Sequence, residues 1–367
     1  LKELCLAKNN ITNVQSIGEA LNLNRTLIRL NLRDNNITNV QSIGEGLTIN
    51  CVLEELYLDD NNITNVQVQS IIKGLQANKT LWTLTILDNK LSYNTNQIVV
   101  STGAKQSIAN VVQAMVKPGE EVILLAPFWV SYSAIVEMAE GVPIIIESGI
   151  EDDFKVKASK IKDYITEKTK MIILNSPNNP SGSMYSENEL RAIGDVLKNY
   201  PNIFVLSDEI YEHIKYGNDH FSFAAIDDMY DRTITVNGVA KAFAMTGWRI
   251  GFIGAPDWIA KACTKLQGQV TSGANCIAQK ATIAAITADV KQISYMVDEF
   301  KSRRKLIIEL LSEIKGIKLN NPDGAFYIFP DISYYFGKEI AIAWSKNFID
   351  QIKIEQRVSR IYFTQLP

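Results

Sequence analysis

A short pattern occurs four times in the first 91 residues. The segments LKELCLAKNNI, LIRLNLRDNNI, LEELYLDDNNI and LWTLTILDNKL begin at residues 1, 27, 53 and 81, so the spacings are 26, 26 and 28 residues. Such a period indicates stacked copies of one structural unit, because a single copy cannot bury its own apolar face. The repeat therefore restricts the first part of the chain to a linear array and argues against one compact core for all 367 residues.

Each copy fits the spacing L-x-x-L-x-L-x-x-N-x-L, and in the fourth copy these positions are Leu81, Leu84, Ile86, Asn89 and Leu91. Leucines at alternate positions of a short strand point into a shared core. The asparagines can satisfy turn backbone groups that stacking buries; they are Asn9, Asn35, Asn61 and Asn89. Residues 40–47 carry apolar residues at helical spacing, which predicts a short helix between strands. The pattern resembles leucine-rich repeats of the ribonuclease-inhibitor-like class, which assigns residues 1–96 to such an array with four strands.

The repeats have two interpretations, and both stay open. Solenoid repeats bind proteins on an extended face, and the variable strand positions that would do so here are Lys2, Glu3, Arg29, Asn31, Glu54, Tyr57 and Trp82. The alternative is a solvated face of a short array. Because the first repeat has no obvious cap and the sequence begins with Leu1 rather than Met, we expect a fragment or a composite of a longer product.

From about Gln97 the pattern changes to short apolar strands that alternate with helical segments. This alternation predicts an α/β fold with a parallel sheet, in which ligands bind at the carboxyl ends of the strands. The expected strands are Ile98–Ser101, Glu121–Ala126, Met171–Asn175, Ile203–Ser207, Thr233–Val236 and Ile250–Gly254. At roughly 150 residues per domain, the length also favours two domains.

Three motifs in this second part occur in a fixed order: NSPNNPSG at 175, SDEIY at 207 and NGVAKAFAMTGWRIG at 237. Together with STGAKQ at 101 and APFWVSY at 126, they are similar to pyridoxal-phosphate-dependent class I aminotransferases of the bacterial aspartate aminotransferase type. The resemblance runs from residue 97 to 337. It implies a large domain with a mostly parallel sheet and helices on both faces, the cofactor pyridoxal 5′-phosphate, and transamination between an aspartate-like L-amino acid and a 2-oxo acid.

Two of the motif residues have roles that follow from their chemistry. Lys241 lies among apolar neighbours, where desolvation would lower the pKa of its amine and leave it free to react with a carbonyl group. The resemblance implies that Lys241 holds the cofactor and moves the proton during catalysis. Asp208 ends an apolar strand, where a buried carboxylate needs a cationic partner. The protonated pyridine nitrogen of the cofactor would be that partner.

The resemblance assigns the other cofactor contacts. Gly103, Ala104 and Lys105 open a helix whose N-terminus can receive a phosphate, and Arg249 would add a guanidinium to it. Tyr211 and Asn179 match residues that hydrogen-bond the phenolic oxygen of the cofactor. Trp129 matches the aromatic residue that stacks on its ring. Trp129 and Asn179 are also expected to contact substrate, and Lys105 resembles a residue that some relatives use for a dicarboxylate.

The chain departs from the family at three places. Residue 240 is Ala where the family has a phosphate-binding Ser, and leucine-rich repeats replace the N-terminal part of the family's small domain. Residues 338–367 match the rest of that domain poorly, so Arg357 and Arg360 are uncertain substitutes for the arginine that binds the substrate carboxylate. The alternative function is therefore a leucine-rich-repeat interaction module fused to an impaired aminotransferase relic.

The composition argues against several classes of partner. The net charge of −3 argues against nucleic acid, and the apolar stretch 122–136, which contains Pro127, argues against a membrane span. Two histidines and four scattered cysteines argue against a metal site and favour a reducing, cytoplasmic location. Relatives are homodimers, so a homodimer is the expected assembly, together with a protein partner of the repeats.

Overall fold

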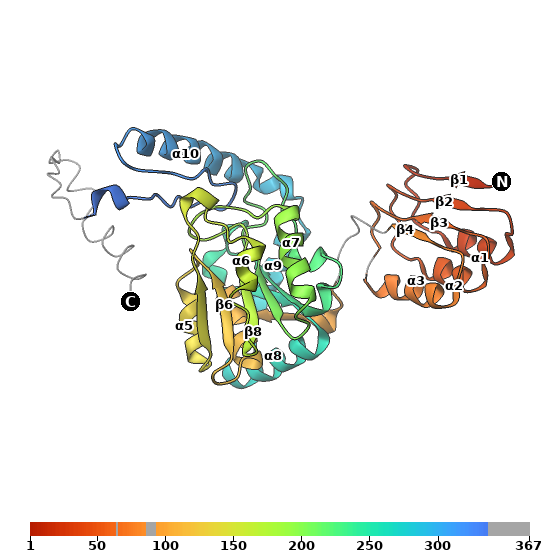
Figure 1. Cartoon of the computed structure of the whole chain (residues 1–367), viewed down its shortest axis with the longest axis horizontal. Helices are drawn as coiled ribbons and strands as arrows, with labels where there is room; N and C mark the ends of the chain where they lie inside the picture. The colour runs from red at the N-terminus through yellow and green to blue at the C-terminus, as the bar shows by residue number, and fades with distance from the viewer. Residues whose placement is uncertain (64, 86–92, 337–367) are drawn as a thin grey trace. The chain divides into compact units, whose positions relative to one another are not determined.

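The computed structural model describes residues 1–63, 65–85 and 93–336 (Figure 1). The chain divides into two compact units, Leu1–Asn94 and Thr95–Pro367. Three positions of the fourth repeat (Ile86, Asn89 and Leu91) lie outside the described residues, as do the tail 338–367 and both of its candidate arginines, Arg357 and Arg360.

The first unit alternates short strands with helices. Its elements are β1 (Glu3–Cys5), α1 (Gln15–Leu23), β2 (Arg29–Asn31), α2 (Gln41–Ile49), β3 (Glu55–Tyr57), α3 (Asn65–Ala77) and β4 (Thr83–Thr85). The strands form a parallel sheet in the order β1-β2-β3-β4. Leu30 and Leu56, the central residues of β2 and β3, are fully buried between the sheet and the helices. The helix expected at residues 40–47 is α2, displaced by one or two residues.

Two asparagines hold the turns of this unit together. The side chain of Asn61 accepts a hydrogen bond from the backbone N–H of Ile37 at 3.0 Å, and its amide donates to three backbone carbonyls at 2.9 to 3.1 Å. Asn35 makes the equivalent bonds one repeat earlier. The sequence prediction is confirmed for these two residues. Asn9 differs: it is exposed, and its side-chain amide donates only within its own turn, to the carbonyl of Ala7 at 2.8 Å.

The second unit contains the larger sheet. Its strands are β5 (Ile98–Ser101), β6 (Glu121–Leu125), β7 (Val142–Ile146), β8 (Thr169–Asn175), β9 (Phe204–Asp208), β10 (Thr233–Gly238) and β11 (Gly251–Gly254). Its helices are α4 (Ala104–Met115), α5 (Ser131–Met138), α6 (Ala158–Lys162), α7 (Glu187–Lys198), α8 (Asp257–Val270), α9 (Cys276–Thr287) and α10 (Ser294–Ser312). Single 3₁₀ turns occur at Thr95–Gln97, Ile150–Asp152, Phe223–Ala225, Tyr230–Arg232, Thr246–Trp248, Val290–Ile293 and Ser333–Tyr335.

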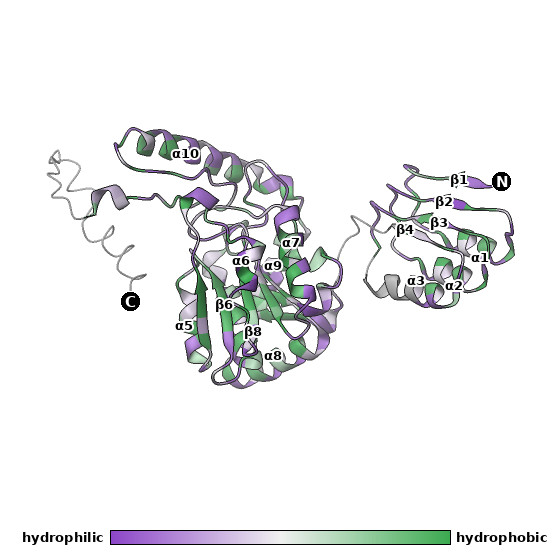
Figure 2. Ribbon diagram, in the orientation of Figure 1, coloured by the Kyte–Doolittle hydropathy of each residue, from purple (hydrophilic) through white to green (hydrophobic). Residues whose placement is uncertain are grey.

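Helices cover both faces of this sheet (Figure 1). Successive residues of a strand point to opposite faces. Met171 and Ile173 of β8 accordingly join the core formed with α4, α5 and α8, whereas Ile172 and Leu174 join the core formed with α6 and α7. A strand buried on both faces carries a continuous apolar run, as the green central parts of β6 and β8 in Figure 2 show. The α/β class expected from the sequence is confirmed.

The strand order is β5-β11-β10-β9-β8-β6-β7. All pairs are parallel except those of β11, which is antiparallel to both β10 and β5. The expectation of parallel strands is therefore wrong for β11, because the 12-residue connection from β10 contains no crossover helix long enough to reverse the chain. The sequence analysis also missed β7. Its Pro143 weakens the strand signal, and a proline is accommodated there because β7 lies at the edge of the sheet.

Among the described residues, every helix is too short or too polar to cross a lipid bilayer.

Candidate active site

The carboxyl ends of four strands meet at one edge of the larger sheet. β8 ends at Asn175, β9 at Asp208, and β10 at Gly238, three residues before Lys241. β5 runs parallel to β10, because both pair antiparallel with β11, so its last residue Ser101 lies at the same edge. Open α/β sheets bind ligands at this edge.

A cavity of about 230 Å³ opens at this edge. All nine residues that the sequence predicted as cofactor or substrate contacts line it: Gly103, Ala104, Lys105, Trp129, Asn179, Asp208, Tyr211, Lys241 and Arg249. The remaining lining residues are Tyr132, Asn175, Ile210, Ala240, Thr246 and Tyr327. Motifs that are up to 146 positions apart in the sequence therefore form one site.

Asp208 is the most deeply buried acid of the cavity, with 4% of its surface exposed. The hydroxyl of Tyr132 donates to its Oδ2 at 2.6 Å, and the N–H of Ile210 donates to its Oδ1 at 3.3 Å. Burial raises the pKa of Asp208 to about 6, although the bond from Tyr132 opposes the rise. The carboxylate is therefore mostly ionised at neutral pH and can attract a cation that enters the cavity.

Lys241 is half-buried at the cavity wall. Burial lowers the pKa of its amine, while the carboxylate of Asp208 opposes this shift and the guanidinium of Arg249 adds to it. The direction is the one expected from the sequence. The Nζ atom lies 5.7 Å from the ring centroid of Tyr211 and 5.6 Å from that of Phe326. A lysine with a lowered pKa provides the neutral amine that a nucleophile needs.

Arg249 lies against the first turn of α4. A Cβ atom on Gly103, which has φ +86°, would lie 2.5 Å from Nη2 of Arg249, so only glycine allows this approach. A Cβ atom on Gly251 would lie 2.2 Å from the backbone nitrogen of Ala104. Arg249 itself has a left-handed φ of 55°, and its Nη1 donates to the carbonyl of Thr246 at 3.0 Å. A guanidinium and N–H groups at a helix start are groups that can bind an anion.

Two tyrosines from distant segments meet at the cavity wall. The hydroxyl oxygens of Tyr211 and Tyr327 are 2.6 Å apart. The side chain of Asn179 also hydrogen-bonds Tyr211. Asn175 fixes the loop that carries Asn179, because its Oδ1 accepts from the backbone N–H of Asn179 at 2.8 Å and its Nδ2 donates to the carbonyl of Asp208 at 2.9 Å.

Trp129 and Lys105 form the remaining side of the cavity. The Nζ of Lys105 lies 4.7 Å from the ring centroid of Trp129, within the range of a cation–π contact. The rings of Trp129 and Tyr132 meet edge to face at 5.5 Å. This contact couples the indole to the tyrosine that holds Asp208.

Five further residues line the cavity although no role was predicted for them from the sequence: Tyr132, Asn175, Ile210, Thr246 and Tyr327. Tyr132, Asn175, Ile210 and Thr246 lie inside the motifs that carry the family resemblance, and this position was the available signal, whereas Tyr327 lies outside those motifs. Their contacts could not be predicted, because they are made to residues far away in the sequence.

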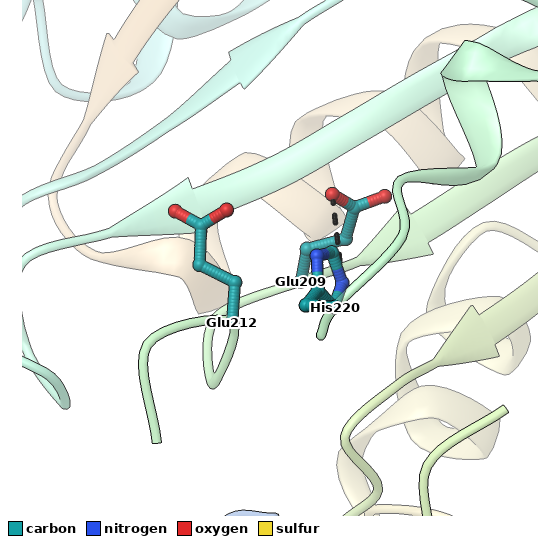
Figure 3. Close-up of side chains that lie close together, drawn as sticks. All are labelled: Glu209, Glu212 and His220. Atoms are coloured by element: carbon teal, nitrogen blue, oxygen red, sulfur yellow. Dashed lines mark ion pairs between the residues drawn. The ribbon is translucent and has the colours of Figure 1, made fainter. Parts of the chain in front are cut away.

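A second polar cluster follows the end of β9 in the chain (Figure 3). The ligand atoms of Glu209, Glu212 and His220 lie within 4.8 Å of one another. Oε2 of Glu209 is 3.9 Å from Nε2 of His220, and the same nitrogen lies 3.2 Å from the carbonyl of Ser176. Glu212 accepts a hydrogen bond from Asn237 at 2.7 Å. The sequence did not predict this grouping, because the two acids and the histidine carried no recognisable ligand spacing.

Glu209 is held as a buried acid. Its Oε1 accepts hydrogen bonds from the hydroxyls of Ser207 and Ser222 at 2.8 and 2.9 Å, and from the N–H of Phe223 at 3.3 Å. Burial nevertheless raises its pKa to about 8, and burial lowers the pKa of His220. Glu209 and His220 are therefore mainly uncharged at neutral pH, and they tie the loop after β8 to the end of β9.

Replacement of Glu209 by Gln tests this assignment. The pKa of Glu209 is near 4.5 in the unfolded chain and about 8 in the folded protein. Between these pH values the folded protein holds a proton on Glu209 that the unfolded chain has lost, so the free energy of unfolding falls as pH rises. Glu209→Gln removes that fall. The measurement is urea unfolding at several pH values, followed by hydrogen exchange in β8 and β9. Parallel pH profiles of the two proteins would contradict the assignment; Glu209→Ala, which removes the acceptor, should be destabilised throughout.

The chain matches the family model for aminotransferases of class I and II over residues 31–362. It is 46% identical to a bifunctional aspartate aminotransferase and glutamate/aspartate-prephenate aminotransferase of Petunia hybrida, over 69% of this chain and 54% of that protein. It is 45% identical to an aspartate/prephenate aminotransferase of Nitrosomonas europaea, over 67% and 62%. The chain thus spans about half to three fifths of the length of these relatives.

Solved structures agree with the sequence comparison. The aspartate aminotransferase of Rhizobium meliloti superposes with a TM-score of 0.65 at 40% identity, covering 66% of this chain and 61% of that one. The aspartate aminotransferase of Thermus thermophilus with maleate gives 0.62 at 38% identity, covering 66% and 63%. Family, relatives and cavity agree, and the chain belongs to the class I and II aminotransferases.

Proposed function

We propose that this chain is a pyridoxal-phosphate-dependent transaminase that exchanges an amino group between an aspartate-like L-amino acid and a 2-oxo acid. The observation that carries the proposal is the cavity, which combines a half-buried amine, a buried carboxylate and an anion site. The named relatives are aspartate and aspartate/prephenate aminotransferases, which supports an amino donor of this kind.

The cavity residues fit the cofactor of this family. Asp208 would hold the pyridine nitrogen, Arg249 with Gly103 and Ala104 the phosphate, and Tyr211 with Asn179 the phenolic oxygen. Bound pyridoxal phosphate supplies an electron sink for the negative charge that develops on the substrate Cα. Ala240 has no hydroxyl to offer the phosphate. One missing hydrogen bond to a charged group costs roughly 1.5–3 kcal/mol, which weakens binding without abolishing it.

Lys241 performs the proton chemistry in this proposal. Its lowered pKa leaves a neutral amine, which would hold the cofactor and could also accept the proton that leaves the substrate Cα. Trp129 and Asn179 border the space where substrate would lie, and the ammonium group of Lys105 offers a cation for a second carboxylate.

We further propose three parts: a leucine-rich-repeat array at residues 1–96, the cofactor-binding domain at 97–337, and a small-domain remnant at 338–367. The parallel β1–β4 array and the asparagine bonds of its turns support the first part. A homodimer is supported by exposed Ile277, Ile283 and Ile286 on α9. The four free cysteines are consistent with a cytoplasmic location.

The second candidate function is a repeat module that binds a protein through its strand face. Arg29 lies in register between Glu3 and Glu55 and forms ion pairs with both. Tyr57 donates to Glu55 at 2.6 Å, and Trp82 is 70% exposed. The exposed indole favours a binding surface, because large aromatic residues are enriched at interfaces. In this alternative the second unit is a catalytically impaired relic.

Absorbance and turnover separate the two candidates. Purified chain mixed with pyridoxal phosphate should gain a visible absorbance band that Lys241→Ala loses, because the amine that binds the cofactor is gone. Lys261→Ala, at an exposed position of α8 paired with Asp257, is the matched control and should keep the band. A colourless wild type would overturn the cofactor assignment. Colour without turnover of aspartate and 2-oxoglutarate would favour the relic.

Replacement of Tyr132 by Phe tests the role of Asp208. The change leaves Oδ2 of Asp208 without its donor, so the carboxyl group becomes harder to ionise and holds the cofactor less well. The dissociation constant for pyridoxal phosphate should rise about tenfold or more, as measured by fluorescence titration. Tyr185→Phe removes another buried tyrosine hydroxyl, which accepts a hydrogen bond from the backbone N–H of Val156 at 2.8 Å. Tyr185 does not line the cavity, so this change should leave the affinity unchanged. Equal affinity of Tyr132→Phe and wild type would refute this role.

A further inference from the structure

The hydroxyls of Tyr211 and Tyr327 make a close contact at the cavity wall, 2.6 Å apart. Tyr211 follows β9, whereas Tyr327 belongs to the segment that follows α10, 116 positions later. This bond is one of several that tie the segment after α10 to the residues that follow β9.

The rings leave the two hydroxyls little freedom. Tyr211 packs edge to face against Tyr327, with centroids 5.7 Å apart, and against Phe326, with centroids 5.4 Å apart. Tyr211 is 2% exposed, and Ala325 beside Phe326 is fully buried. The positions of the oxygens are therefore fixed, and only the hydroxyl hydrogens can turn.

The number of hydrogens decides what the pair can do. A hydroxyl has one hydrogen, so only one of the two tyrosines donates within the pair. Asn179 also hydrogen-bonds Tyr211. If Tyr327 donates to Tyr211, the hydrogen of Tyr211 remains free for an oxygen in the cavity. If Tyr211 donates to Tyr327, that hydrogen is used within the pair.

We propose that Tyr327 is a positioning residue, which donates its hydrogen bond to Tyr211 and thereby turns the Tyr211 hydroxyl toward an anionic oxygen in the cavity. The proposal rests on the proposed function, since that oxygen would be the phenolic oxygen of pyridoxal phosphate. An anion favours this arrangement, because a chain of donors that ends on a negative charge strengthens each of its bonds in a low-dielectric site. Tyr327 thus acts through Tyr211 and need not touch the cofactor.

The test is a pH titration of the visible absorbance of the cofactor-loaded protein. In the loaded protein, negative charge on the phenolic oxygen would help to retain a proton on the nitrogen of Lys241, and a hydrogen bond from Tyr211 would withdraw part of that charge. Loss of Tyr327 weakens this bond, so the nitrogen keeps its proton to higher pH. In Tyr327→Phe the midpoint should rise by roughly 0.2–0.6 pH units. Tyr211→Phe should raise it further.

Tyr216→Phe is the matched control. Its hydroxyl donates to the backbone carbonyl of Ala325, in the segment that also carries Tyr327, but Tyr216 does not line the cavity. Both variants should lose a similar amount of thermal stability, and only Tyr327→Phe should shift the midpoint. An unchanged midpoint in Tyr327→Phe, or an equal shift in Tyr216→Phe, would overturn this proposal alone. A colourless wild type would overturn both this proposal and the function on which it rests.

Discussion

The buried carboxylate of Asp208 is the constraint on which the site depends. A charge in a sheet interior needs donors, and Asp208 obtains them from Tyr132 of α5 and from the backbone after β9. These bonds offset only part of the cost of burial, since the pKa of the acid remains raised to about 6. The site is therefore best satisfied when a cation enters the cavity, and the protonated ring nitrogen of the proposed cofactor meets this requirement.

The part of the cavity around Arg249 depends on the course of the backbone as well as on the charge of the guanidinium. Two positions without a Cβ, Gly103 and Gly251, allow β11, the guanidinium of Arg249 and the start of α4 to approach one another. The antiparallel direction of β11 contributes as well, because it places Arg249, which precedes that strand, at the edge where the parallel strands end. The topology thus brings the cation of the anion site to the same edge as the acid.

The sequence predicts the composition of the site better than its contacts. All nine expected residues line one cavity, because each belongs to a motif at the end of a strand or at the start of a helix. The bonds of Tyr132 to Asp208 and of Tyr327 to Tyr211 join residues 76 and 116 positions apart, and no local pattern encodes such pairings. The direction of β11 is likewise not encoded by any local pattern. Periodicity identifies a strand, whereas its neighbours decide which way it runs.

The central claim is that Lys241 is the amine that binds pyridoxal phosphate. Reduction of the loaded protein with borohydride fixes the cofactor to its lysine, and trypsin cannot cleave after a modified lysine. The account predicts that mass spectrometry finds the added mass on the undivided peptide 233–249, which contains Lys241 between Arg232 and the cleavage site after Arg249. Added mass at Lys105 instead, or distributed over exposed lysines, would contradict it.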